Sequence, residues 1–249
     1  MGKKTAPRTF GLLGKNIDYS FSRGYFAEKF KRENIDNATY VNFDLPHENE
    51  IKALVQRTDI SGINITIPYK EKVQAHLDAL SEEAKAIGAV NTIVFDKNNQ
   101  RIGHNTDAYG FETALFSQWK PNTKAALILG TGGASKAVHY VLSKKGIRPQ
   151  YVSRQAGENK IAYQDLSPEI MQTHQLIVNC TPLGTHPDID QSPPLPFDLI
   201  SPEHHVFDLI YNPATTLLMQ RAQAQGASTQ NGHQMLIHQA EKSWELWNT

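Results

Sequence analysis

Residues 124–142, KAALILGTGGASKAVHYVL, join a short apolar run to an amphipathic one through a cluster of glycines. The run Ala125 to Leu129 has the length and composition of a buried strand, and the residues from Gly133 to Leu142 have the apolar spacing of a helix. Glycines at such a junction let the backbone approach a pyrophosphate, whose charge is met by free amides and the helix dipole. The stretch predicts a dinucleotide site, although glycine turns also have ordinary structural uses.

The kind of dinucleotide is indicated by the end of the next predicted strand. An NAD site usually places an acidic residue about 20 positions after the glycine loop. Here the strand ends in Ser153-Arg154-Gln155, and a guanidinium suits the 2′-phosphate of NADP. The sequence therefore predicts NADP, with a solvated surface charge as the alternative for Arg154. Ser135 replaces the third glycine of the usual fingerprint.

The rest of the chain alternates short apolar runs with amphipathic ones, which predicts an α/β fold with mainly parallel sheets. A compact Rossmann unit is expected at about residues 106–232, with Thr106 as the N-cap of its first helix. The expected strands are residues 10–13, 40–43, 63–67, 90–95, 101–103, 124–129, 150–153, 176–180 and 206–211. The expected helices include residues 25–31, 50–56, 70–87 and 232–247.

Polar residues interrupt the predicted strand at 63–67. Period-two alternation puts Asn64 and Thr66 on one face, where they need partners from neighbouring backbone or from a hydroxylated ligand. Lys70 follows at the end where parallel strands place binding groups. When hydride from a nicotinamide reduces a ketone, a proton donor is needed at the ketone oxygen. A lysine beside a carboxylate can supply this proton, and we expect Lys70 and Asp107 to be this pair. The alternatives are a surface cation for Lys70 and a helix N-terminal charge for Asp107.

Bulk composition excludes several classes of protein. The 249 residues suit two modest domains, and 25 basic against 25 acidic residues leave no excess charge for nucleic acid or anionic membrane. A small-molecule partner is therefore expected. The longest apolar runs are strand-sized, which predicts a soluble protein. No signal peptide is evident and Cys180 is the lone cysteine, so a cytoplasmic location is expected. Cys180 is interpreted as a small core residue. His204, His205 and Asp208 are interpreted as a surface His pair beside a strand, and no metal is expected.

The ordered motifs of the whole chain resemble the shikimate dehydrogenase family. They are the glycine loop together with Ser20-Phe21-Ser22, Asn64 to Lys70, Asn91, Asn105-Thr106-Asp107, Asn179 to Gly184, Asp208 to Pro213, Asn231-Gly232, Met235-Leu236 and Gln239. The resemblance implies a substrate-binding domain of residues 1–105 with 233–249, and a Rossmann NADP-binding domain of residues 106–232. The last helix would return to the N-terminal half, and the active site would lie between the domains.

The same resemblance implies a role for each site residue in the reduction of 3-dehydroshikimate to shikimate, a step of aromatic amino acid biosynthesis. Lys70 and Asp107 would be the catalytic pair. Ser20 and Ser22, with Tyr211 nearby, would hold the carboxylate. The ring hydroxyls would contact Asn64, Thr66, Asn91, Asp107 and Gln239. The cofactor would contact Gly130, Thr131, Gly132, Gly133, Ala134, Ser153, Arg154, Thr181, Leu209 and Gly232.

Two departures from the family pattern leave alternatives open. Ser153 and Gln155 flank Arg154 where Asn and Thr are common, and Thr185 stands where Met often follows the Pro-Leu-Gly turn. Activity on quinate, use of NAD, and a sensor that binds NADP or a shikimate-like acid without catalysis therefore remain alternatives. Retention of both Lys70 and Asp107 argues against the sensor. A monomer or a homodimer is expected.

Overall fold

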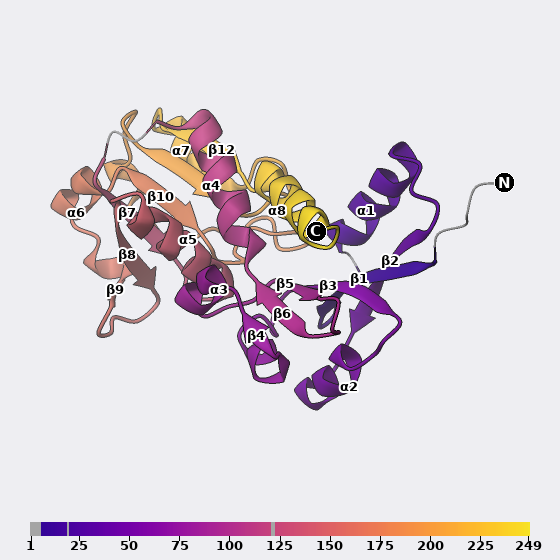
Figure 1. The fold of residues 1–249 in the computed structure, drawn as a ribbon. Helices are drawn as coiled ribbons and strands as arrows, with labels where there is room; N and C mark the ends of the chain where they lie inside the picture. Colours follow the sequence, from indigo (N-terminus) through magenta and orange to yellow (C-terminus); the bar gives the residue numbers. More distant parts are fainter. Residues whose placement is uncertain (1–5, 19, 121–122) are drawn as a thin grey trace. The chain divides into compact units, whose positions relative to one another are not determined.

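The structure is a computed structural model that describes residues 6–18, 20–120 and 123–249. The chain divides into two compact units, which Figure 1 shows with their helices and strands labelled. Unit 1 comprises Met1–Thr106 with Ala240–Thr249, and unit 2 comprises Asp107–Gln239. The second boundary falls inside the last helix, α8 (His233–Leu246), so this helix contributes residues to both units.

Within the described residues, unit 1 is built on a six-stranded sheet of order β2-β1-β3-β5-β6-β4. Its strands are β1 (Arg8–Gly14), β2 (Ala38–Asp44), β3 (Ile60–Ile65), β4 (Ala79–Leu80), β5 (Thr92–Phe95) and β6 (Arg101–His104). Strand β1 pairs in parallel with β2 and β3, and β4 pairs in parallel with β6. Strand β5 runs antiparallel to β3 and β6, as a hairpin with β6. The sheet is therefore mixed but mainly parallel.

Alternating side chains of β1 belong to different hydrophobic clusters on the two faces of the sheet. Phe10 and Leu12 face a cluster that includes α1 (Phe21–Arg32) and the end of α8, while Leu13 faces α2 (Ile51–Val55). Figure 1 shows α1 and α2 on opposite sides of β1. Trp247 packs so closely on Gly62 that a Cβ there would lie 2.3 Å from Nε1, and it donates a hydrogen bond to the Ile93 carbonyl at 2.9 Å. The end of the chain thus completes the N-terminal core.

The prediction of one helix over residues 70–87 is wrong. This segment contains a 3₁₀ turn (Lys72–His76), the edge strand β4 and the short helix α3 (Glu82–Ile87). Strand β4 forms because Asp78 and Ser81 donate backbone hydrogen bonds to Arg101 and Gly103 at 3.0 and 2.9 Å. The Ser81 hydroxyl then caps α3 by accepting from the Ala84 amide. Pairing with a distant strand has overridden the local helical pattern.

Unit 2 is a parallel sheet with the strand order of a Rossmann fold, as predicted. Its described strands are β7 (Ala125–Leu129), β8 (Arg148–Ser153), β9 (Lys160–Ala162), β10 (Leu176–Asn179), β11 (His205–Asp208) and β12 (Ser228–Asn231). The order is β12-β11-β10-β7-β8-β9, and every adjacent pair is parallel. The chain order reverses at β7, so the switch point where such sheets bind ligands lies between β7 and β10.

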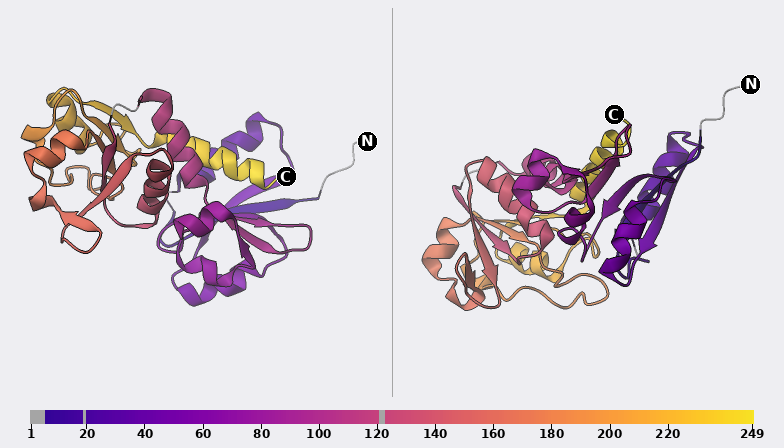
Figure 2. Two further views of the ribbon diagram at one scale, coloured as in Figure 1. Left: turned by 60° about the vertical axis from the view of Figure 1, so that its left-hand side comes forward. Right: turned by 60° about the horizontal axis from the view of Figure 1, so that its bottom comes forward.

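Four helices accompany this sheet: α4 (Thr106–Gln118), α5 (Gly133–Lys144), α6 (Pro168–Thr173) and α7 (Leu217–Ala224). Figure 2 shows α5 against the sheet from two further directions, and α5 contacts β7 and β8. Helix α7 contacts β11 and β12. All residues of β7 are buried, which explains its unbroken apolar sequence.

Several boundaries differ from the expected ones. The third strand ends at Ile65 instead of residue 67, and β11 ends at Asp208 instead of 211. Helix α4 begins at Thr106, so Thr106 lies inside the helix and is not its N-cap. Strands β9 and β12 were not predicted, because both are short and partly polar edge strands. No helix in the described residues is long and apolar enough to cross a membrane.

The prediction of a surface His pair is also wrong, since His204 and His205 are buried. His204 bonds to Ser201 and the Met171 carbonyl, while His205 stacks on Trp119 and bonds to Ser228.

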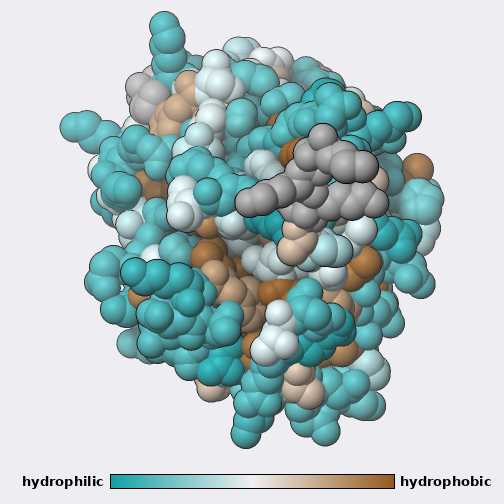
Figure 3. All heavy atoms as spheres, turned by 45° about the vertical axis from the view of Figure 1, so that its right-hand side comes forward, coloured by the Kyte–Doolittle hydropathy of each residue, from teal (hydrophilic) through white to brown (hydrophobic). Residues whose placement is uncertain are grey.

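The surface of the molecule that is visible in Figure 3 is mostly hydrophilic. Among the described residues the exposed large apolar side chains are Val41, Ile67, Tyr109 and Ile189.

Candidate active site

Strand directions in unit 1 bring the predicted substrate residues to one edge of the sheet. Thr66 follows the carboxyl end of β3, and Asn91 precedes β5 at the same edge because β5 is antiparallel to β3. Asn105 and Thr106 follow β6, which runs antiparallel to β5 and so ends at this edge too. We call this the polar edge. It places Asn64, Thr66, Lys70 and Asn91 in one part of unit 1.

The loop after β1 carries Ser20, and the first turn of α1 carries Ser22. At Gly14, the last residue of β1, a Cβ would lie 2.6 Å from Cγ2 of Thr66, so the loop begins against Thr66. Ser20 precedes α1, but its side chain makes no capping hydrogen bond. The Ser20 hydroxyl is buried and has no hydrogen-bond partner among the described residues. Because a buried hydroxyl without a partner is unfavourable, this donor fits a ligand oxygen such as a carboxylate.

Lys70 is held at the polar edge by its backbone. Its carbonyl accepts from the Val90 amide at 2.8 Å, next to Asn91, and the Tyr69 amide bonds to the Thr66 carbonyl at 3.0 Å. The Tyr69 ring is buried, and its hydroxyl donates to the Leu45 carbonyl at 2.6 Å. The buried tyrosine anchors the turn that carries the partly exposed Lys70.

Asp107 and Gln239 belong to unit 2 and are both buried. Gly110, one turn after Asp107 on α4, has room for no side chain, since a Cβ would lie 2.6 Å from the Met235 carbonyl and 3.0 Å from Cβ of Gln239. This close crossing brings the first turn of α4 beside the turn of α8 that carries Gln239. Tyr211 is partly buried after β11, also in unit 2.

The glycine loop fits a pyrophosphate. Gly132 is the N-cap of α5 and supplies no side-chain cap, and no acidic residue lies in the first turn. A Cβ at Gly132 would meet no atom within 4 Å, so the space beside this backbone is open. Gly133 and Ala134 begin the helix, and the Ser135 hydroxyl turns back to the Gly132 carbonyl at 2.7 Å. The free amides at this end of a 12-residue helix can meet phosphate charge.

Four predicted cofactor residues form a continuous line across the carboxyl ends of adjacent strands. At Gly130, whose φ is +95°, a Cβ would lie 3.0 Å from Cγ2 of Thr181. The Leu209 amide bonds to the Asn179 carbonyl at 3.0 Å, two residues before Thr181. At Gly232 a Cβ would lie only 2.0 Å from the Leu209 carbonyl, so no other residue fits there without backbone movement. We call this line, Gly130-Thr181-Leu209-Gly232, the dinucleotide edge.

Arg154 and Ser153 lie at the end of β8, the strand next to β7 on the side away from β10. Arg154 is exposed, and the Ser153 hydroxyl bonds to the Gln155 carbonyl at 2.5 Å. Thr131 is exposed in the glycine loop. The structure therefore places a guanidinium at the position where Rossmann folds bind the 2′-phosphate of NADP.

A buried carboxylate that the sequence did not select as a site residue supports the dinucleotide edge. Asp208 accepts from Asn179 at 2.9 Å, from the Ile210 amide at 3.1 Å and from Thr216 at 2.7 Å. Asn179 in turn accepts from both the amide and the hydroxyl of Thr181, at 3.0 and 2.7 Å. Burial raises the pKa of Asp208 to about 6. The chain of bonds fixes the turn that carries Thr181.

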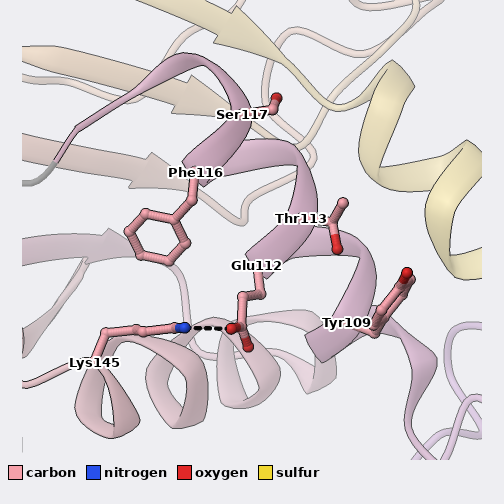
Figure 4. A pocket seen from close by; sticks show the side chains of 6 residues that line it. All are labelled: Tyr109, Glu112, Thr113, Phe116, Ser117 and Lys145. Atoms are coloured by element: carbon pink, nitrogen blue, oxygen red, sulfur yellow. Dashed lines mark ion pairs between the residues drawn. The ribbon is translucent and has the colours of Figure 1, made fainter.

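Two other features offer no reaction centre. Burial raises the pKa of the Cys180 thiol, which opposes formation of a nucleophilic thiolate. Figure 4 shows a pocket lined by Tyr109, Glu112, Thr113, Phe116, Ser117 and Lys145. An ion pair between Lys145 and Glu112 neutralises both charges. The pocket contains none of the predicted site residues. No cluster of His, Cys, Asp and Glu suited to a metal occurs in the described part of the chain.

Comparisons with known proteins identify the family. A family profile described as "Shikimate dehydrogenase substrate binding domain" matches residues 12–93. A "Shikimate dehydrogenase (NADP(+))" of Desulforamulus reducens is 35% identical, covering 95% of this chain and 88% of its own length. The crystal structure of the Thermus thermophilus shikimate 5-dehydrogenase "in complex with NADP(H) and shikimate" is 32% identical, with a TM-score of 0.84 over 96% of this chain and 93% of that one.

A relative with a different name has a similar fold. A "Quinate dehydrogenase from Corynebacterium glutamicum in complex with NAD" is 26% identical, with a TM-score of 0.83 over 98% of this chain and 94% of that one. The curated relative and the Thermus structure each match this chain over most of both lengths and at more than 30% identity. The chain belongs to the shikimate dehydrogenase family.

Proposed function

We propose that this protein catalyses the reversible, NADP-dependent reduction of 3-dehydroshikimate to shikimate in aromatic amino acid biosynthesis. One observation carries the proposal: the same chain holds a polar edge with an unpartnered buried hydroxyl, Ser20, and a Rossmann dinucleotide edge beside Arg154. Relatives named as NADP-dependent shikimate dehydrogenases support it.

We propose unit 1 with the returning part of α8 as the substrate domain, and the Rossmann unit as the NADP domain. NADPH supplies the hydride to the ketone carbon when bound. Lys70 donates a proton to the ketone oxygen as that carbon is reduced, and accepts it in the reverse direction, with Asp107 as its carboxylate partner. Proton transfer of this kind contributes roughly 10²–10⁴-fold to the rate.

The substrate carboxylate is assigned to Ser20 and Ser22, with Tyr211 contributing from unit 2. The ring hydroxyls are assigned to Thr66, Asn91, Asp107 and Gln239, and Asn64 belongs to the same polar edge. Two features support these assignments. Hydroxyl and amide groups suit a polyol acid, and burial of Asn91, Asp107 and Gln239 strengthens each hydrogen bond that they make. The free Cys180 is compatible with a cytoplasmic enzyme.

A spectrophotometric assay tests the proposal. The purified protein should reduce NADP when given shikimate, with a rise in absorbance at about 340 nm that depends on both reactants. Absence of turnover with shikimate or quinate, in the presence of either NADP or NAD, would reject the enzyme in favour of a binding protein. Calorimetry with shikimate would then measure whether the acid still binds.

A quinate or mixed quinate/shikimate enzyme is the second candidate, supported by the similarity to the quinate dehydrogenase with NAD and by the altered neighbours of Arg154. The ratio of kcat/KM for the two acids with each cofactor separates the candidates. Arg154→Ala should raise KM for NADP about tenfold and leave KM for NAD nearly unchanged, since a lost charged contact costs about 1.5 kcal/mol. Arg148→Ala, an exposed arginine at the opposite end of β8, is the matched control.

A further inference from the structure

The polar edge of unit 1 contains a buried group of hydroxyls that no prediction from the sequence selected as a site. Thr92 begins β5, Thr106 follows β6 and Ser243 lies on α8, and all three side chains are buried. Their oxygens are close together: Ser243 Oγ lies 2.8 Å from Thr92 Oγ1 and 3.1 Å from Thr106 Oγ1. We call these three residues the hydroxyl cluster.

The hydroxyl cluster accepts hydrogen bonds from the side-chain amide of Asn64. Its Nδ2 donates to Ser243 at 2.9 Å and to Thr92 at 3.1 Å, while its Oδ1 accepts from the Tyr40 hydroxyl at 2.9 Å. An amide NH₂ has two protons, and the acceptors around them are these two cluster oxygens and, at 3.3 Å, the Asn91 carbonyl. The hydrogen bonds of the Asn64 side chain are therefore satisfied by the protein itself.

The same cluster sets the orientation of Asn91. The Thr106 backbone amide can only donate, and it lies 2.6 Å from the Asn91 side-chain oxygen, so this end of the amide must be Oδ1. The opposite end, Nδ2, then donates to Thr106 Oγ1 at 2.9 Å. Thr92 Oγ1 also donates to Asn91 Oδ1 at 3.1 Å. Hydrogen bonds from Thr92, at the start of β5, and from Thr106, after β6, thus fix which end of the Asn91 amide is the oxygen.

We infer that Ser243 and Asn64 are positioning residues, which hold the amide of Asn91 in the orientation that binds a substrate hydroxyl. This inference rests on the proposed function for the role of Asn91. It changes the role that the family resemblance implies for Asn64, from a substrate ligand to a support of the ligand. Ser243 is the link that α8 contributes, because its hydroxyl contacts Asn64, Thr92 and Thr106 at once.

Ser243→Ala tests the inference through the separate kinetic constants. Loss of the hydroxyl leaves buried partners in the cluster incompletely bonded, at a cost of about 1–3 kcal/mol. We expect KM for shikimate to rise about tenfold, kcat to fall much less, and KM for NADP to stay constant. Ile51→Val is the control for lost stability, since Ile51 is buried in the α2 core and its shortening costs about 1 kcal/mol. An equal rise of KM in both variants, or none in Ser243→Ala, overturns the inference.

The role of Asn64 is tested in a background that already lacks the cluster. In Ser243→Ala/Thr92→Val protein, Asn64→Ala should change KM for shikimate less than twofold, although in the wild-type background it should raise KM about tenfold. A direct substrate ligand would cost a similar factor in both backgrounds. Similar increases of KM for shikimate in the two backgrounds would therefore show that Asn64 binds the substrate directly, and would reject its assignment as a positioning residue.

An NMR measurement remains decisive if the protein does not turn over shikimate. In protein labelled with ¹⁵N-asparagine, Ser243→Ala should shift the side-chain amide signals of both Asn64 and Asn91, and Ile51→Val should shift neither. Unshifted signals would show that Ser243 does not orient these amides. If the signals shift but the protein does not turn over shikimate, the proposed function is rejected. The hydrogen-bonded network that orients Asn91 would still be supported.

Discussion

His205 and Asp208 are the first and last residues of β11, and burial shifts their pKa values in opposite directions, so that the pKa of Asp208 lies above that of His205. Burial lowers the pKa of His205 from 6.5 to about 4, and it raises the pKa of Asp208 from 3.8 to about 6. Both groups avoid charge in the core of unit 2. The two titrations therefore affect stability in nearly the same pH range with opposite sign.

The opposed titrations predict a small net effect of acid from this strand. Between pH 6.5 and 4 the unfolded state binds more protons at His205, so His205 destabilises the fold as pH falls. Between pH 6 and 3.8 the folded state binds more protons at Asp208, so Asp208 stabilises the fold as pH falls. Each contribution between pH 7 and pH 4.5 is about 2 kcal/mol.

Urea unfolding at the two pH values, with His205→Gln and Asp208→Asn, checks this prediction. Relative to wild type, His205→Gln should become more stable on acidification, and Asp208→Asn should become less stable, each by about 2 kcal/mol. Ser117→Ala, a substitution of an exposed residue on α4, should follow the wild-type curve. Three parallel pH curves would contradict the assignment of these pKa values.

Ser20→Ala should separate binding from stability. The hydroxyl has no hydrogen-bond partner among the described residues, so its removal should leave the melting temperature within about 1 °C. If the hydroxyl binds the substrate carboxylate, KM for shikimate should rise about tenfold or more, since charged hydrogen bonds contribute about 1.5–3 kcal/mol. Steady-state kinetics and thermal unfolding measure the two effects. An unchanged KM would remove Ser20 from the substrate site.

Lys70→Ala should lose about 10²-fold or more in kcat, because it removes the group that we propose as the proton donor to the ketone oxygen. The dissociation constant for shikimate, measured by calorimetry, should change much less than kcat. Lys85→Ala is the control, because Lys85 is an exposed lysine of unit 1 that pairs with Glu82 on its own helix. Comparable kcat values for Lys70→Ala and wild type would exclude Lys70 from proton transfer.

Gly132→Ala should weaken cofactor binding without loss of stability. Its Cβ would meet no protein atom within 4 Å, so the methyl group enters the open space that we assign to the pyrophosphate. KM for NADP should rise at least about tenfold, while the melting temperature stays constant. Gly24→Ala on α1 is equally free of contacts and should leave KM for NADP unchanged, while the melting temperature rises because alanine favours the helix. Normal KM for NADP in Gly132→Ala would move the pyrophosphate away from this loop.

The sequence was sufficient to predict features that depend on local pattern. The buried strand Ala125–Leu129, the glycine loop and the α5 helix follow from apolar spacing and turn residues, and the structure confirms them. The helix expected over residues 70–87 failed because hydrogen bonds from Asp78 and Ser81 to β6 depend on a partner more than 20 residues away. Local pattern also could not reveal that both His204 and His205 are buried.

For the candidate site, the structure shows which of the expected residues lie close together in unit 1. Asn64, Asn91 and Thr66 were expected beside Lys70, and the strand directions place them at one edge of unit 1. Thr92 and Ser243 were missed, although Thr92 adjoins Asn91 and Ser243 lies one helical turn after Gln239. Their roles arise only when the antiparallel register of β3 and β5 and the return of α8 bring separate hydroxyls together. Asp208 was noticed for its sequence neighbours, while its actual partners are Asn179 and Thr216.

Unit 1 consists of two segments that lie on either side of unit 2 in the sequence, and this arrangement affects the order of folding. Residues 107–239 form a continuous segment that can collapse as soon as it leaves the ribosome. The sheet begun at Arg8 must wait for Trp247 to cover Phe10 and Gly62, more than 230 residues later. The sheet of unit 1, whose first strand is made early, can therefore complete its core only after Trp247 has been synthesised.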